Sequence, residues 1–195
     1  MAITTEQIKE LRDSTGVSIM QCKNALEEAG GDMDKARVIL QKLSSKAASK
    51  KADRELGSGT VAAYIHGGGA VGAMVELQCE TDFVSKNEEF QALARDIAMH
   101  VAAQNPEFLK KEDIDDEARK KATEVFEKEA EGKPDEIKGK IIEGKLDSYL
   151  KDKTLLEQDF IKDPSKTISG LIEEAIQKFG EKVELSRFER FGVLE

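Results

Sequence analysis

The residue types that most often carry out chemistry are few in this sequence and widely separated. Its two histidines, His66 and His100, fall at the end of a predicted strand and within a predicted helix, and neither has a Cys, Asp or His at zinc-ligand spacing. Cys22 and Cys79 each fall on an apolar face, which predicts two reduced core thiols rather than a disulfide. No serine or cysteine lies in a nucleophile motif, so we expect no metal, no cofactor and no enzymatic activity.

A binding function is better supported, and its strongest candidate is the stretch of residues 80–90. Alternating apolar residues over 71–79 predict a half-buried strand before this stretch. The apolar residues of 90–101 recur with helical period after it. A short segment is therefore expected to be held between two rigid elements.

Within this stretch, Ser85 and Glu88 have the spacing of a capping box that begins the helix. Asp82 and Phe83 are then expected in a tight turn between strand and helix. The local pattern alone favours a buried Phe83 over an exposed one, because aromatic side chains are more often packed than displayed.

Composition limits the possible partners. The 195 residues carry a net charge of −9, which opposes general binding to nucleic acids or anionic membranes. Basic and acidic residues balance over 1–56, whereas 57–195 carries the acidic excess, so we expect two modules with different surfaces. No signal peptide or membrane-length apolar run is present, which predicts a soluble, cytoplasmic protein.

The first module, residues 1–56, is predicted to be a bundle of three short helices followed by a basic connector. Thr4, Ser18 and Asp32 are placed to cap the three helices, and each helix carries one apolar stripe. The Lys-rich residues 44–54 are expected to extend the third helix.

The second module, residues 57–195, is predicted to be an α+β core with a small antiparallel sheet. Strands are expected at 60–66 and 71–79, joined by a turn at Gly67–Gly69, with a last strand at 182–191.

Two further helical features are predicted in the core. Residues 113–152 suggest an antiparallel helical hairpin whose link is Gly132-Lys133-Pro134. Asp163-Pro164-Ser165 is expected to open a last helix, which Gly180 ends.

Two separated motifs resemble signatures of the elongation factor Ts family. Residues 11–26 read LRDSTGVSIMQCKNAL and resemble the N-terminal signature, while residues 76–86 read ELQCETDFVSK and resemble the second. Residues 97–103 and 163–167 match further along, so the resemblance covers essentially the whole chain. Gln78 stands where the family usually has Asn.

The resemblance implies a guanine-nucleotide exchange factor that acts in translation elongation. Such a factor binds elongation factor Tu–GDP and promotes GDP release by disturbing the magnesium and phosphate site, which allows GTP to rebind. Long members contain two related core halves and this chain has one. It therefore resembles the short form, which works as a homodimer in a two-to-two complex.

The resemblance also assigns roles to residues in the first module. The N-terminal bundle is similar to a ubiquitin-associated domain that docks on the GTPase domain of elongation factor Tu. Arg12, Ile19 and Met20 match positions that contribute to this contact.

In the second module, the family motif places Thr81, Asp82, Phe83 and Val84 at the partner interface. Asp82 and Phe83 match the pair that approaches the nucleotide-binding half, where the aromatic inserts between partner side chains. His66 matches a position that touches another domain of the partner. The helical hairpin corresponds to a protruding coiled coil.

The resemblance thus reverses the local preference at Phe83, which is now expected to be exposed. The alternative is a ubiquitin-associated-type adaptor or a nascent-chain-binding module without exchange activity. The second motif discriminates between the two, because an adaptor has no need of it.

Overall fold

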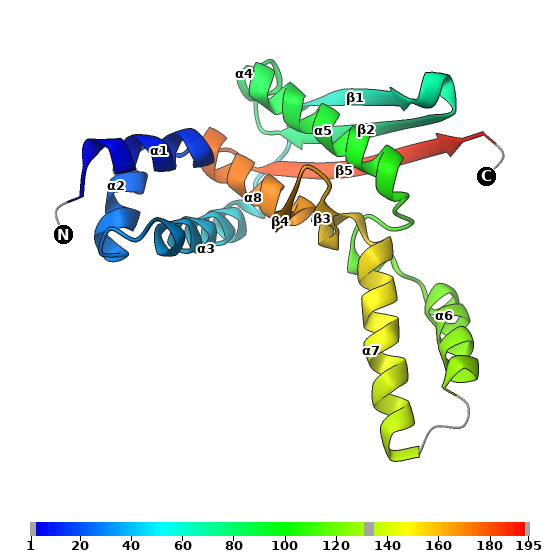
Figure 1. The fold of residues 1–195 in the computed structure, drawn as a ribbon. Coiled ribbons are helices and arrows are strands. Elements are labelled where there is room, and N and C mark those ends of the chain that lie inside the picture. Colours follow the sequence, from blue (N-terminus) through cyan, green and yellow to red (C-terminus); the bar gives the residue numbers. More distant parts are fainter. Residues whose placement is uncertain (1–2, 131–134, 194–195) are drawn as a thin grey trace.

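The computed structural model describes residues 3–130 and 135–193 of the chain, and its fold is α+β. Helices at the N-terminus lie beside a core built on a small antiparallel sheet, and two further helices extend away from that core (Figure 1). This arrangement confirms the predicted fold class. The predicted hairpin link at Gly132-Lys133-Pro134 lies outside the described residues.

The N-terminal bundle forms as its capping residues predict. Its helices are α1 (Thr5–Thr15), α2 (Ile19–Glu28) and α3 (Met33–Lys51). The side chains of Thr4, Ser18 and Asp32 each accept a backbone N–H from the first turn of their helix. Leu11 and Leu26 are fully buried in the small core that the three helices enclose.

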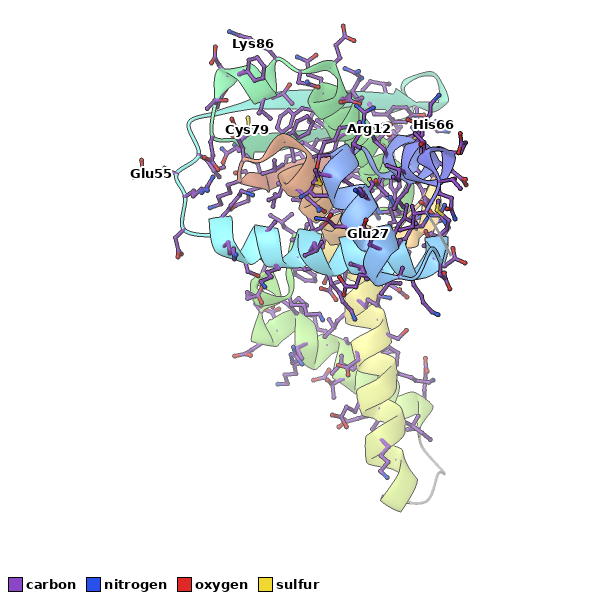
Figure 2. The ribbon with its side chains drawn as sticks, turned by 90° about the vertical axis from the view of Figure 1, so that its left-hand side faces the viewer. Arg12, Glu27, Glu55, His66, Cys79 and Lys86 are labelled. Carbon is purple, nitrogen blue, oxygen red and sulfur yellow. The ribbon has the colours of Figure 1, made fainter. Side chains whose placement is uncertain are left out.

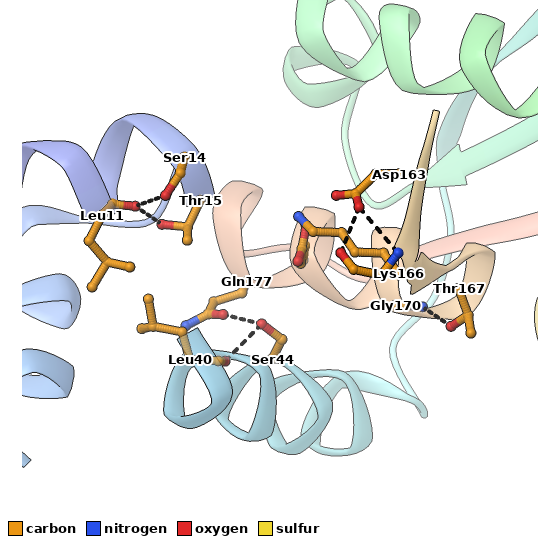
Figure 3. Close-up of polar contacts among 12 residues, drawn as sticks. Leu11, Ser14, Thr15, Leu40, Ser44, Asp163, Lys166, Thr167, Gly170 and Gln177 are labelled. Atoms are coloured by element: carbon orange, nitrogen blue, oxygen red, sulfur yellow. Dashed lines mark hydrogen bonds and ion pairs between the residues drawn. The ribbon is translucent and has the colours of Figure 1, made fainter. Parts of the chain in front are cut away.

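Helix α3 is longer than the bundle and also packs against α8 (Ile168–Phe179) of the core. Ala36 and Leu40 face the bundle core, one or two turns before Ser44. The buried Ser44 hydroxyl hydrogen-bonds the Leu40 carbonyl oxygen at 3.1 Å and also the side chain of Gln177 on α8 (Figure 3). One continuous helix therefore contacts both buried clusters.

The core sheet has three antiparallel strands in the order β1-β2-β5. They are β1 (Ser58–His66), β2 (Val71–Cys79) and β5 (Val183–Gly192). The β1–β2 turn, Gly67–Gly69, has positive φ at all three residues, a conformation that suits glycine. The predicted strands and turn are confirmed, and the last strand joins β2 rather than β1.

Helix α5 (Glu88–Gln104) covers one face of this sheet. Its predicted apolar stripe is buried, with Phe90, Ile97 and Val101 fully inaccessible. The helix ends at Asn105, which adopts the left-handed conformation immediately before Pro106.

The start of the last helix differs from the prediction. Residues 163–167 form a short strand, β4 (Asp163–Thr167), which pairs with β3 (Asp159–Phe160). The Asp163 carboxylate accepts from the backbone and hydroxyl of Ser165, so this acid closes a local turn. Thr167 instead caps α8 by accepting the N–H of Gly170 at 3.1 Å (Figure 3).

The protruding helices are α6 (Asp116–Glu129) and α7 (Asp135–Lys153), which lie side by side as the predicted hairpin (Figure 1). Phe126 and Tyr149 make an edge-to-face contact between them, with ring centroids 5.8 Å apart. No helix in the described part of the chain is both long and apolar enough to span a membrane.

Candidate functional site

The predicted turn at Asp82 and Phe83 is a single helical turn, α4 (Asp82–Ser85). The predicted capping box is wrong, because α5 is capped two residues later by Asn87, which accepts the N–H of Glu89 at 2.9 Å. Ser85 faces inward instead. Its hydroxyl lies 2.8 Å from the Ser58 hydroxyl on β1, which joins α4 to the sheet.

The two faces of α4 differ sharply in exposure. Phe83 is 81% exposed, whereas its neighbour Val84 is 4% exposed and belongs to the main core. The expectation from local pattern that Phe83 is buried is therefore wrong, and the exposure expected from the resemblance is confirmed. The buried aromatic position beneath α4 and α5 belongs to Phe90, which contacts Phe179 edge-to-face.

Asp82 presents a negative charge beside this exposed ring. Lys86 Nζ lies 2.6 Å from Asp82 Oδ2, and both side chains are exposed. This hydrogen bond from Lys86, with its positive charge, lowers the pKa of the Asp82 carboxyl. Asp82 is therefore ionised at neutral pH.

The segment before α4 is held by two glutamates in a reciprocal arrangement. Glu181 accepts both donors of Thr81: the backbone N–H at 3.0 Å and the hydroxyl at 2.6 Å. Glu80 accepts the backbone N–H of Lys182, and Arg54 also donates to it at 3.1 Å. No local sequence signal predicts these contacts, because Thr81 and Glu181 are a hundred residues apart.

Cys79 is a buried residue at the base of this segment. It is fully buried at the end of β2, and its thiol donates to the Thr81 carbonyl oxygen at 3.2 Å. Burial, reinforced by the negative charge of Glu181, raises the pKa of this thiol to about 11. Cys79 and Cys22 are both buried free thiols, as predicted.

The residues expected to dock the bundle form a second exposed group. Ser18 caps α2, so Ile19 and Met20 occupy its first turn, where they are 59% and 63% exposed. Arg12 is exposed near the end of α1. Ile19 and Met20 are large apolar side chains in water, which is typical of an interaction surface when they are adjacent.

His66 belongs to neither group. It ends β1 at the tip of the hairpin, where its Nδ1 lies 3.0 Å from the Tyr64 hydroxyl and the two rings stack. Figure 1 places this tip at the end of the sheet opposite the bundle, and Figure 2 marks His66 apart from Lys86 of α4.

The predicted site residues thus form three separate groups: the bundle, α4 and the hairpin tip. Helices α1 and α4 lie on the same half of the molecule (Figure 1). Within the residues that the structure describes, no three His, Cys, Asp or Glu side chains gather as a metal site would require. The three groups lie at separate places on the surface of the molecule.

Comparisons with known proteins agree with the two signatures. The family model described as "Elongation factor TS" matches residues 33–195. Elongation factor Ts of Carboxydothermus hydrogenoformans is 49% identical over 99% of this chain and 90% of its own length. That of Thermosipho melanesiensis is 47% identical, over 99% of this chain and its own full length. This chain belongs to the elongation factor Ts family of translation elongation factors.

Proposed function

We propose that this protein is a guanine-nucleotide exchange factor that binds elongation factor Tu–GDP and promotes release of GDP. The observation that carries the proposal is the exposure of Phe83, which is 81% accessible beside the ionised Asp82. Among the exposed large apolar side chains of the described residues, Phe83 is the most accessible. The short helix α4, joined to β1 through Ser85 and Ser58, holds this ring in a defined place.

Phe83 inserts between side chains of the partner and disturbs its magnesium and phosphate site. Exchange needs no covalent chemistry, because the factor binds nucleotide-free partner more tightly than the GDP form. Linkage makes this antagonism reciprocal: the factor lowers GDP affinity by the same ratio by which GDP lowers affinity for the factor. Phe83 must therefore make contacts that form only after the phosphate site has shifted.

The bundle supplies the docking affinity for nucleotide exchange, in the way that a ubiquitin-associated domain docks on its partner. Arg12, Ile19 and Met20 present one cationic and two apolar side chains, a composition common in binding hot spots. Val84, which is buried, contributes by seating α4 on the core rather than by direct contact. Thr81 contributes to binding indirectly, because it fixes the position of the backbone at the start of α4.

We also propose a homodimer in a two-to-two complex, working in the cytoplasm with translation. The sheet face not covered by α5 has an apolar half near the hairpin tip. Three large side chains are exposed there, namely Ile65, Met74 and Phe191, and Val61 is exposed further along β1, where it pairs with Glu76. Ile65 and Phe191 flank Gly72 across three adjacent strands, so they lie on one continuous surface. His66 ends β1 next to this surface. In the dimer it would contact the elongation factor Tu molecule bound to one subunit or the other.

The test is a stopped-flow assay of fluorescent GDP release from purified elongation factor Tu. The wild-type protein should accelerate release, and Phe83→Ala should abolish most of that acceleration. A wild-type protein that binds elongation factor Tu but leaves GDP release unchanged would favour an adaptor and overturn the proposal.

A further inference from the structure

The turn that carries Phe83 is closed by a carboxylate from a distant part of the chain. Cys79 and Val183 are paired neighbours in the sheet, so the loop after β2 and the loop before β5 lie at the same end of it. Across this end, Glu181 binds Thr81 and Glu80 binds Lys182. Each loop therefore uses an acid to satisfy a backbone N–H of the other.

At this end of the sheet, the acceptors of both contacts are carboxylates rather than neutral side chains. Burial is the main cause of the raised pKa of the Cys79 thiol, and the negative charges of Glu181 and, to a smaller extent, Glu80 raise it further. The property that a carboxylate adds is a fork of two oxygens, which receives both donors of Thr81 at once and fixes that residue in orientation.

Orientation at Thr81 matters because it is the N-cap residue of α4, yet its hydroxyl makes no cap hydrogen bond within α4. A four-residue helix is not stable by itself. Its inner face is held by Val84 and Ser85, while Thr81, the residue that precedes it, is held by Glu181 through two donors. The Thr81–Glu181 pair consequently limits rotation of α4, and with it the direction of the Phe83 ring.

We propose that Glu181 is a positioning residue for nucleotide exchange, acting through Thr81 to fix the Phe83 ring for insertion into the partner. This inference rests on the proposed function of Phe83 as the inserted side chain. Removal of the Glu181 carboxylate leaves the exposed Thr81 donors free to bind water, so the cost to folding is small. The cost to exchange is larger, because the ring samples directions that do not fit the partner.

A fluorescence measurement tests the orientation directly. The chain has no tryptophan, so Phe83→Trp introduces a single reporter at the inserted position. In this background, Glu181→Ala should shorten the rotational correlation time of the local motion, and Glu181→Gln, which keeps one acceptor oxygen, should be intermediate. The matched control is Glu174→Ala, which removes a carboxylate of α8 that is bonded to Lys166 instead. An unchanged anisotropy decay in Glu181→Ala overturns the positioning role.

Exchange kinetics provide the second readout, with Phe83 restored. Glu181→Ala should lower the maximal rate of GDP release by about tenfold, the equivalent of one hydrogen bond to a charged group, and change the half-maximal concentration much less. In the Phe83→Ala background the same substitution should add little. A Glu181→Ala protein with a wild-type maximal rate overturns the proposal. If Phe83→Ala itself leaves exchange intact, the role of Phe83 fails and this proposal fails with it, whereas a wild-type protein that does not accelerate GDP release overturns the proposed function itself.

Discussion

His100 and Gln158 form a buried side-chain pair, with the imidazole Nε2 2.9 Å from the amide Oε1. On the other side of the ring, Nδ1 accepts the backbone N–H of Ile161 at 3.2 Å. The imidazole is therefore neutral, with its proton on Nε2. His100, a candidate for chemistry by residue type, instead ties α5 to the segment before β4.

This pair predicts a specific loss of stability in acid. Burial lowers the pKa of His100 below its unfolded value of 6.5, so between the two values the unfolded chain binds more protons than the native one. The free energy of unfolding should therefore fall as the pH drops below 6.5, by at most about 1.4 kcal/mol per pH unit from this group. Urea unfolding at several pH values measures the slope. His100→Gln should reduce it, and equal slopes in His100→Gln and the wild-type protein would contradict the assignment.

Two phenylalanines seven residues apart should lose very different amounts of stability on substitution by alanine. Phe90→Ala empties a fully buried position and should destabilise the protein by about 3–5 kcal/mol. Phe83→Ala removes an exposed ring and should change stability by no more than about 0.5 kcal/mol. Thermal unfolding compares them. A large loss of stability in Phe83→Ala would mean that its ring packs in solution.

Docking of the bundle and insertion of Phe83 should affect different kinetic parameters. Arg12→Ala and Met20→Ala should raise the concentration of factor needed for half-maximal GDP release, because they weaken docking in every nucleotide state. Phe83→Ala should mainly lower the maximal rate, since its contacts form only in the shifted state. A titration of each variant against elongation factor Tu–GDP measures both quantities. Identical behaviour of Met20→Ala and Phe83→Ala would remove the distinction.

Cys79 should be inert in the native protein despite lying beneath the candidate site. With a pKa of about 11, its thiolate is scarce at neutral pH, and the side chain is fully buried. In a Cys22→Ala background, an aromatic disulfide reagent should react far more slowly with the native protein than with the urea-unfolded one. Rapid native reaction would show that the turn at Thr81 opens readily.

If the proposed dimer forms through the sheet face that α5 leaves uncovered, a charge introduced on that face should disrupt it. Phe191→Asp should convert the dimer to a monomer in light scattering after size exclusion, because it buries an unpaired charge in an apolar contact. Ile161→Asp changes an exposed apolar residue away from this sheet and serves as the control. A Phe191→Asp protein that remains dimeric would place the interface elsewhere.

Local signals predicted most of the helix starts, and they failed where two capping residues compete. Ser85 and Asn87 are both suitable caps for α5, and the choice is made by the inward contact of Ser85 with Ser58. Similarly, Asp163 and Thr167 are both cap residues, and pairing of β4 with β3 leaves the role to Thr167. Tertiary contacts decide such cases, and a local pattern does not contain them.

Some features of the candidate site could be predicted from the sequence, and others could not. Exposure of Phe83 was predicted only from the resemblance, because the local pattern favours a buried aromatic at this position. Glu181 follows the helix-ending Gly180 and resembles any acid in a loop. Its role depends on the pairing of β2 with β5, a contact between segments a hundred residues apart. The prediction of two modules divided near residue 56 stays a prediction.

The continuity of α3 has a consequence for binding. One end of this helix carries Ala36 and Leu40 of the bundle core, and the other packs against α8 of the sheet domain. The bundle and α4 are therefore presented to a partner as parts of one stiff body. In the proposed complex, docking through Met20 and its neighbours would bring Phe83 to its target at a high effective concentration, with little rotational freedom left to lose.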